Sequence, residues 1–175
     1  MKKIIAFGAS SSKTSINKQL AAYTANQFQN ASVEILDLND YEMPIFSIDK
    51  EIENGIPQLA HDFYAKLGSA DLIIISFAEH NGAYSAAFKN IFDWASRING
   101  KTFQEKPILL LATSPGARGG SSVLEIANNR FPFQGGIVKG SFSLPNFNDN
   151  FDSEEGITNE ELKNELLKIV NSIEL

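Results

Sequence analysis

The sequence has no cysteine and only two histidines, His61 and His80. Disulfides, thiolate nucleophiles and thiolate metal sites are therefore excluded, and so is a histidine-rich metal site. No apolar run approaches the roughly 18 residues that a membrane-spanning helix needs. The N-terminus shows no signal-peptide pattern. These absences predict a cytoplasmic protein that binds no metal through a dedicated cluster.

Excess positive charge is also missing, because the formal net charge is −6. A negative field repels phosphate backbones and anionic lipid surfaces, which argues against nucleic-acid and membrane partners. Hydrophobic residues make up 43% and charged residues 21% of the chain, close to the average of globular proteins. The length of 175 residues fits one folded domain that spans residues 1–175.

Five short apolar runs alternate with helical patterns along the chain. Two of them contain stretches, 72–75 and 108–111, without any polar residue, as is typical of strands covered on both faces. The five predicted strands are Lys3–Phe7, Val33–Leu38, Asp71–Phe77, Pro107–Thr113 and Gly136–Phe142. The predicted helices are Ser15–Phe28, Pro57–Leu67, Ser85–Ile98, Ser121–Phe131 and a C-terminal helix opened by a capping box at Thr158–Glu161. This order predicts a doubly wound α/β domain, in which ligands bind at the carboxyl ends of the strands.

The loop after the first predicted strand is rich in hydroxyl groups. Residues 8–17 bring five hydroxyls, one ammonium group and backbone N–H groups to the start of a helix, which suits a phosphate. The same residues could instead form a turn that only caps the helix. A Walker A loop is excluded, because Lys13 follows Gly8 one residue too early and no second glycine precedes it. The G-x-G-x-x-G pattern of dinucleotide-binding folds is absent as well, and so are the acidic residues that a receiver domain has after its first strand.

Two further loops reach the same predicted edge of the sheet. After the third strand, Asn81-Gly82 predicts a tight turn, since both residues tolerate positive φ. Beside this turn, His80 could simply be a surface histidine, and Glu79 a solvated carboxylate or the partner of a cation. After the fourth strand, residues 113–120 include three glycines, which allow the backbone to approach a flat ligand closely. Three such loops at one edge indicate a ligand site.

These segments together resemble the NADPH-dependent FMN reductase family of flavodoxin-like proteins. Residues 9–17 occupy the register of the family's Gly-Ser-x-Arg-x-x-Ser-x-Asn loop. Residues 78–83 match its Pro-Glu-Tyr-Asn-Gly-Ser segment in part, and residues 88–94 resemble its Leu-Lys-Asn-Ala-Ile-Asp-Trp helix. Ser12 stands where the family has arginine, which removes one permanent positive charge; Ala9 and His80 replace a glycine and a tyrosine.

The resemblance implies a flavodoxin-like fold: a five-stranded parallel sheet of order 2-1-3-4-5 with helices on both faces. It implies FMN as cofactor and NADPH or NADH as reductant, with the hydride passed on to a small-molecule electron acceptor such as a flavin, a quinone, an azo compound or a metal ion. It assigns no catalytic side chain, because the flavin carries the chemistry. The residues that it assigns to FMN are Ser10, Ser12, Ser15, Ile16 and Asn17 around the phosphate, Glu79, His80, Asn81 and Gly82 beside the ring, and Ser114, Pro115, Gly116, Gly119 and Gly120 on another side of the ring.

Two other functions remain open, a one-electron carrier that resembles flavodoxin and a flavin-binding module without turnover. The resemblance also implies a homodimer or a dimer of dimers, since related reductases pair subunits through the helix matched here by Ser85–Ile98. Trp94 is expected to widen the apolar face of that helix for a partner subunit. The alternative is that Trp94 packs under a neighbouring loop of its own chain.

Overall fold

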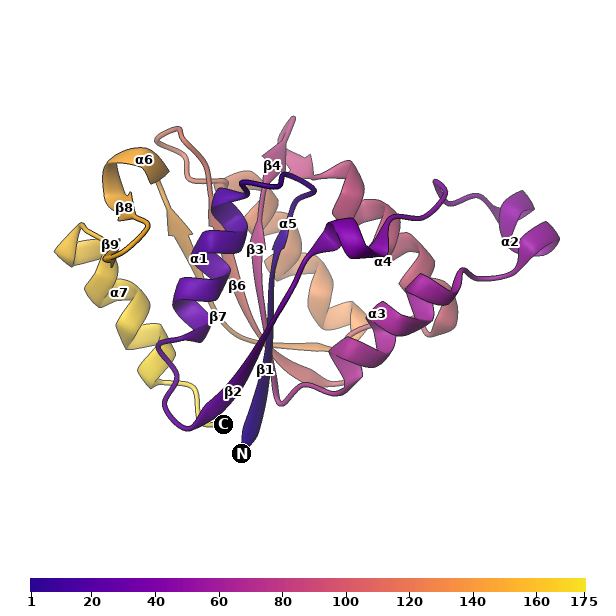
Figure 1. The fold of residues 1–175 in the computed structure, drawn as a ribbon, viewed down its shortest axis with the longest axis horizontal. Helices are drawn as coiled ribbons and strands as arrows, with labels where there is room; N and C mark the ends of the chain where they lie inside the picture. Colours follow the sequence, from indigo (N-terminus) through magenta and orange to yellow (C-terminus); the bar gives the residue numbers. More distant parts are fainter.

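A five-stranded parallel sheet forms the centre of the computed structural model, which describes residues 1–175 (Figure 1). The strands of this sheet are β1 (Lys2–Ala9), β2 (Ala31–Leu36), β3 (Leu72–Phe77), β6 (Lys106–Thr113) and β7 (Gly136–Leu144). They are arranged in the order β2-β1-β3-β6-β7, and every pairing is parallel. Counted along the chain as first to fifth, this is the order 2-1-3-4-5, so the predicted flavodoxin-like fold is confirmed.

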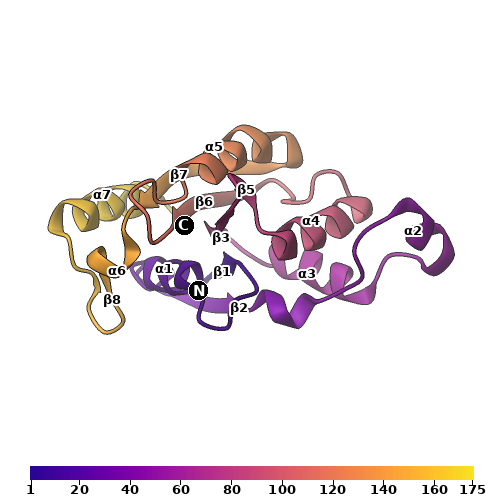
Figure 2. The same ribbon diagram turned by 90° about the horizontal axis from the view of Figure 1, so that it is seen from above.

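Helices cover both faces of the sheet (Figure 2). One face carries α1 (Ile16–Ala25) and α7 (Glu160–Asn171), and the other carries α3 (Gln58–Gly68), α4 (Ala86–Ile98) and α5 (Ser121–Arg130). Successive side chains of β1 alternate between the two cores: Ile4 packs in the core with α1 and α7, and Ile5 in the core with α3, α4 and α5. Because both of their faces are buried, the central strands β1, β3 and β6 are largely apolar along their length.

The starts of α1 and α4 agree with the predicted helices, and the start of α7 does not. Ser15 caps α1 by accepting from the N–H of Lys18, and Ser85 caps α4 by accepting from the N–H of Phe88. The prediction that Thr158 opens the last helix is wrong, because the cap of α7 is Asn159, whose Oδ1 accepts from two N–H groups of the first turn at 3.1 Å. Thr158 is held outside the helix by its N–H, which donates to the carbonyl of Asn150 at 2.9 Å.

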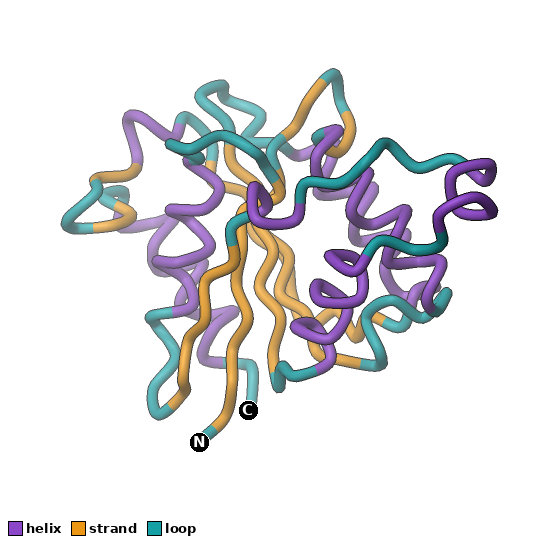
Figure 3. Tube along the Cα trace, turned by 45° about the vertical axis from the view of Figure 1, so that its right-hand side comes forward, coloured by secondary structure: helices purple, strands orange, loops and turns teal.

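Several short elements were not predicted from the sequence. They are the 3-10 helices η1 (Leu38–Tyr41) and η2 (Phe131–Gln134), the helices α2 (Ile48–Asn54) and α6 (Phe147–Asn150), and the hairpins β4 (Glu79–His80) with β5 (Ala83–Tyr84) and β8 (Phe151–Asp152) with β9 (Gly156–Ile157). Helix α2 projects from the body of the molecule, and none of its residues is buried (Figures 1 and 3). No helix combines the length and apolar character that crossing a bilayer requires.

Helix α4 fastens the segment that follows η1. The indole Nε1 of Trp94 donates to the carbonyl of Pro44 at 2.7 Å, and the ring of Phe46 meets the indole edge-on, with 5.0 Å between ring centroids. Asn90 binds the same segment, since its Oδ1 accepts from the N–H of Phe46 at 2.9 Å and its Nδ2 donates to the carbonyl of Met43 at 3.0 Å. With 1% of its surface exposed, Trp94 offers no apolar face to a partner. That expectation is wrong, and the alternative, packing under a loop of the same chain, is confirmed.

Candidate functional site

Three loops meet at a cavity of about 240 Å³ at the carboxyl edge of the sheet, here called the phosphate cavity. The loops are those that follow β1, β3 and β6. Nine of the predicted site residues line it: Ser10, Ser12, Ser15, Ile16, Asn17, Glu79, His80, Ser114 and Pro115. Thr14, Ala78 and Thr113 complete the lining and were missed, although each lies in or next to a predicted loop. The structure therefore brings most of the predicted residues around one space.

The start of α1 presents unpaired donors to the phosphate cavity. The backbone N–H groups of Ile16 and Asn17 have no acceptor within the chain, whereas the hydroxyl of Ser15 is occupied by the N–H of Lys18. The hydroxyls of Ser12 and Thr14 make no hydrogen bond within the chain. Such donors at the positive end of a helix dipole suit one phosphate group. No lysine or arginine lines the cavity, so neutral donors and the dipole would hold that phosphate.

The side chain of Asn17 forms the floor of the cavity and is 3% exposed. Its Oδ1 accepts from the hydroxyl of Ser76 at 2.7 Å and from the N–H of Thr113 at 3.1 Å, and its Nδ2 donates to the carbonyl of Thr113 at 3.1 Å. These bonds join the first loop to the ends of β3 and β6. The sequence gives only a weak indication of these bonds, because Ser76 lies within one apolar strand and Thr113 at the end of another.

The loop after β3 is a two-residue hairpin. Asn81 and Gly82 occupy its turn with φ of 52° and 77°, so the predicted tight turn is confirmed. Positive φ at both positions fits the right-handed twist of the flanking strands. Asn81 and Gly82 lie at the exposed tip and do not line the phosphate cavity, whereas His80 does.

Glu79 connects this hairpin to the loop after β6. Its Oε2 accepts from the N–H groups of Ser122 at 3.0 Å and Val123 at 3.1 Å, in the first turn of α5. The residue that precedes this helix, Gly120, has no side chain with which to cap it. A carboxylate at a helix N-terminus is favoured by the helix dipole. Glu79 is thus neither a solvated carboxylate nor the partner of a cation. Its carboxylate joins the loop after β3 to the helix that follows the loop after β6.

The glycines after β6 set the path of the third loop. Gly119 and Gly120 have φ of 56° and 75°. A Cβ on Gly119 would collide with the hydroxyl oxygen of Ser143, which donates to the carbonyl of Gly119 at 3.0 Å. The carbonyl of Gly116 accepts from the N–H of Asn146 at 3.0 Å. These three glycines lie outside the cavity lining, so their assignment to FMN stays a prediction.

An ion pair fixes the other end of the first loop. Lys18 of α1 binds Asp37, with 2.6 Å between Nζ and Oδ2, and so ties the start of the helix to the segment after β2. The hydrogen bond from Lys18, with one from the N–H of Asn39, holds the pKa of the Asp37 carboxyl below its usual range. The carboxylate is therefore charged at neutral pH and keeps Lys18 from serving as a phosphate ligand.

Comparisons with known proteins agree with this geometry. The model of the NADPH-dependent FMN reductase family matches residues 2–149. An uncharacterized protein of Mycoplasma pneumoniae is 32% identical over 84% of this chain and 89% of its own length. The NADPH:quinone oxidoreductase of Arabidopsis thaliana is 27% identical over 98% of this chain and 90% of its own. Among solved structures, the flavoenzyme NAD(P)H:(acceptor) oxidoreductase FerB of Paracoccus denitrificans superposes with a TM-score of 0.77 at 21% identity, over 98% of this chain and 94% of that one.

Proposed function

We propose that this chain, which belongs to the NADPH-dependent FMN reductase family, is an FMN-dependent NAD(P)H oxidoreductase. The hydride of a reduced nicotinamide would pass to a small acceptor: a flavin, a quinone, an azo compound or a metal ion. FMN supplies the redox-active ring when bound, while the protein supplies binding, orientation and electrostatics. One domain, residues 1–175, would carry the whole reaction.

The observation that carries the proposal is the convergence of three loops on donors that lack partners. The N–H groups of Ile16 and Asn17 and the hydroxyl of Ser12 would bind the FMN phosphate at the start of α1. Ser10 and Ser15 would shape the same loop, because both hydroxyls accept from backbone N–H groups within it. A compact cradle of this kind has room for one phosphate, which favours FMN over a dinucleotide flavin.

The second and third loops would flank the ring. Glu79, His80, Asn81 and Gly82 come from the hairpin on one side, and Ser114, Pro115, Gly116, Gly119 and Gly120 from the loop after β6 on the other. Backbone N–H groups of these loops would stabilise negative charge on the reduced ring, as preorganised dipoles do elsewhere. No side chain is required as nucleophile or base. A homodimer or a dimer of dimers belongs to the same proposal.

Stopped-flow mixing tests this function against its two alternatives. The FMN-loaded protein is mixed anaerobically with NADH or NADPH, and the flavin absorbance near its visible maximum is followed. Fast bleaching with at least one nucleotide, followed by recovery on addition of a quinone, is the expected result. Slow bleaching with both nucleotides would instead identify an electron carrier, and no bleaching a binding module without turnover.

A further inference from the structure

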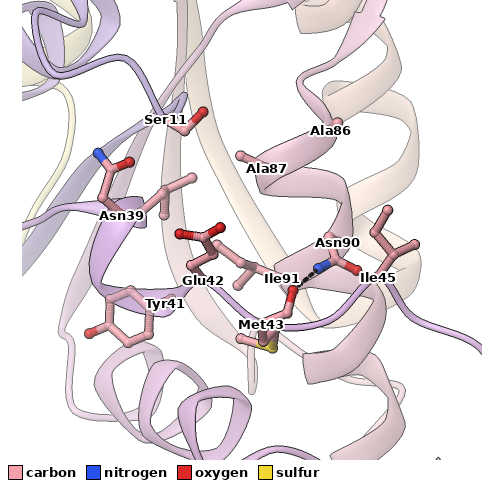
Figure 4. Close-up of a pocket in the computed structure, with 11 residues that line it drawn as sticks. Ser11, Asn39, Tyr41, Glu42, Met43, Ile45, Ala86, Ala87, Asn90 and Ile91 are labelled. Carbon is pink, nitrogen blue, oxygen red and sulfur yellow. Dashed lines mark hydrogen bonds between the residues drawn. The ribbon is translucent and has the colours of Figure 1, made fainter. Parts of the chain in front are cut away.

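A second cavity, of about 380 Å³, lies beside the phosphate cavity and is here called the Glu42 cavity (Figure 4). Ser11 lines it, whereas the neighbouring Ser10 and Ser12 line the phosphate cavity, so the first loop forms a wall of both spaces. Its opposite wall is the first turns of α4 at Ala86 and Ala87, which directly follow the β4–β5 hairpin. A ligand in the Glu42 cavity would therefore lie next to the proposed flavin site.

The shape of the Glu42 cavity is fixed by bonds already described. Its outer wall is the segment at residues 42–45, which Asn90 and Trp94 bind through the carbonyls of Met43 and Pro44. The donors of the Asn90 amide are thereby used within the protein. Leu38, Met43 and Ile91 add apolar surface on which a flat ring could pack.

The free polar groups in the Glu42 cavity include two hydrogen-bond acceptors, the Glu42 carboxylate and the Asn39 amide oxygen, beside the hydroxyl of Ser11. The Glu42 carboxylate has no hydrogen-bond or ion-pair partner in the structure, and Figure 4 shows it pointing into the space between Asn39 and Ala87. Asn39 donates its Nδ2 to Asp37 at 2.7 Å, which leaves its amide oxygen available. A ligand that offers hydroxyl or amino donors is the chemical complement of this arrangement.

The Glu42 cavity has no positively charged side chain in its lining that could bind a phosphate group. No lysine or arginine lines the Glu42 cavity. Two ammonium groups behind the lining are already paired within the protein: that of Lys50 on α2 donates to the carbonyl of Ile45 at 2.8 Å, and that of Lys18 binds Asp37, which accepts from the amide of Asn39. Lys13 lines a separate depression against α1.

We propose that the Glu42 cavity binds the adenosine end of the reduced dinucleotide, with Glu42 accepting from the ribose hydroxyls, and that the protein therefore selects NADH over NADPH. The inference rests on the proposed function and names its reductant. A carboxylate that accepts from the ribose 2′-hydroxyl is how other folds choose NADH, because a 2′-phosphate in its place meets a like charge. The adenine ring would pack on the apolar wall.

The test uses the FMN-loaded protein and two ligands that lack the nicotinamide, ADP-ribose and 2′-phospho-ADP-ribose, titrated by calorimetry. ADP-ribose should bind at least about tenfold more tightly. Glu42→Gln should bring the two dissociation constants to within about threefold, by removing the charge and keeping the shape. Asp49→Asn is the matched control, because it removes an exposed carboxylate of α2 that lies outside the cavity and should leave the ratio unchanged.

A second variant tests whether ADP-ribose binds in the Glu42 cavity. Ala87→Trp fills the Glu42 cavity from α4 and should weaken ADP-ribose binding while the flavin spectrum and the FMN affinity stay as they are. Equal or tighter binding of the 2′-phosphorylated ligand, an unchanged ratio in Glu42→Gln, or no binding of either ligand would overturn the inference. These outcomes leave the proposed function standing, because the stopped-flow test fails only when neither NADH nor NADPH reduces the flavin rapidly.

Discussion

Asn17 and Glu79 both line the phosphate cavity, yet the hydrogen bonds of both side chains run to other parts of the protein. Asn17 binds the ends of β3 and β6, and Glu79 binds the first turn of α5. At the residue scale, the site depends on side chains that hold its loops in place as well as on groups that face the ligand.

Replacement of Glu79 tests this positioning role. Glu79→Ala leaves the N–H groups of Ser122 and Val123 unpaired, and the loss of a helix cap costs about 1–2 kcal/mol. We expect weaker FMN binding, measured by quenching of flavin fluorescence, and a lower free energy of unfolding. Glu79→Gln keeps a carbonyl acceptor and should restore most of both. Equal FMN affinity in wild type and Glu79→Ala would show that the third loop holds its position without Glu79.

Gly82 offers a second test at the same scale. Its φ is 77°, and no atom lies within 4 Å of the place where a Cβ would stand, so conformation and not space requires glycine. Gly82→Val should strain the turn by about 1–3 kcal/mol and weaken FMN binding. Gly100→Val is the matched control, because Gly100 also has open space but no positive φ. Similar FMN affinities in both variants would show that the hairpin turn does not contribute to FMN binding.

At the scale of secondary-structure elements, α4 lines the Glu42 cavity and follows the hairpin whose Glu79 and His80 line the phosphate cavity. It begins directly after the β4–β5 hairpin, and its Asn90 and Trp94 hold the segment that walls the Glu42 cavity. Its exposed side also carries an ion pair from Lys89 to Asp93 at 2.6 Å, as the spacing of four residues permits. The position of this helix therefore links the two cavities.

Trp94→Ala should destabilise the monomer fold. Loss of the buried indole would leave a cavity and would remove the shorter of the two hydrogen bonds to the carbonyl of Pro44, the other coming from Asn90 at 3.2 Å. Substitution of a buried tryptophan by alanine costs about 3–5 kcal/mol. Urea unfolding at fixed pH measures the loss, and Trp94→Phe should recover part of it. An unfolding free energy within about 0.5 kcal/mol of wild type would contradict the packing of Trp94 under residues 44–46.

The strands of the central sheet and the long helices could be predicted from the sequence, and the short helices and the two-residue hairpin strands could not. Strands β3 and β6 and the cap of α1 at Ser15 follow from continuous apolar runs and a serine before a helical pattern. Helix α2 has no buried residue, so it leaves no periodic apolar signal. The contact between Asn17 and Thr113 spans 96 positions of the chain, and local patterns carry no information about such a pair. The loops that form the site could be predicted, but not the bonds between them.

At the scale of the whole molecule, carboxylates bound by cations or backbone N–H groups make the free energy of unfolding depend on pH in the acid range. The hydrogen bond from Lys66 lowers the pKa of Glu34, the hydrogen bond from Lys18 lowers that of Asp37, and the N–H of Lys3 lowers that of Asp71. A pKa that is lower in the folded than in the unfolded protein stabilises the fold above the unfolded value, about 4, and this stabilisation is lost as pH falls through the folded value.

The unfolding free energy should therefore stay level between about pH 7 and 5 and fall steeply below about pH 4. Asp37→Asn should lower stability at neutral pH and make the fall on the acid side shallower, because one of four contributions is gone; the fourth is that of Asp152, whose pKa is lowered by the N–H groups of Glu155 and Glu154. Asp49→Asn, which removes an exposed carboxylate of α2, should leave the curve unchanged. Parallel curves for wild type and Asp37→Asn would contradict this account.

Assembly is a separate prediction at this scale. One chain has a mass of 19.2 kDa, and light scattering of the FMN-loaded protein should give twice or four times that value. With Trp94 buried in its own chain, a partner could instead contact three exposed apolar residues on the segment that includes α2: Ile45, Ile48 and Ile52. Ile48→Lys combined with Ile52→Lys should shift the mass toward one chain. A wild-type mass near 19.2 kDa at micromolar concentration would end the dimer prediction.

The central claim is that the start of α1 holds the phosphate of FMN through the N–H groups of Ile16 and Asn17 and the hydroxyl of Ser12. The most direct test compares FMN with riboflavin, which has the same ring and ribityl chain but no phosphate, by quenching of flavin fluorescence. The account predicts that FMN binds at least about 100-fold more tightly, since several hydrogen bonds to a charged group, each of about 1.5–3 kcal/mol, depend on the phosphate. Equal affinities for FMN and riboflavin, or no quenching by FMN, would contradict it.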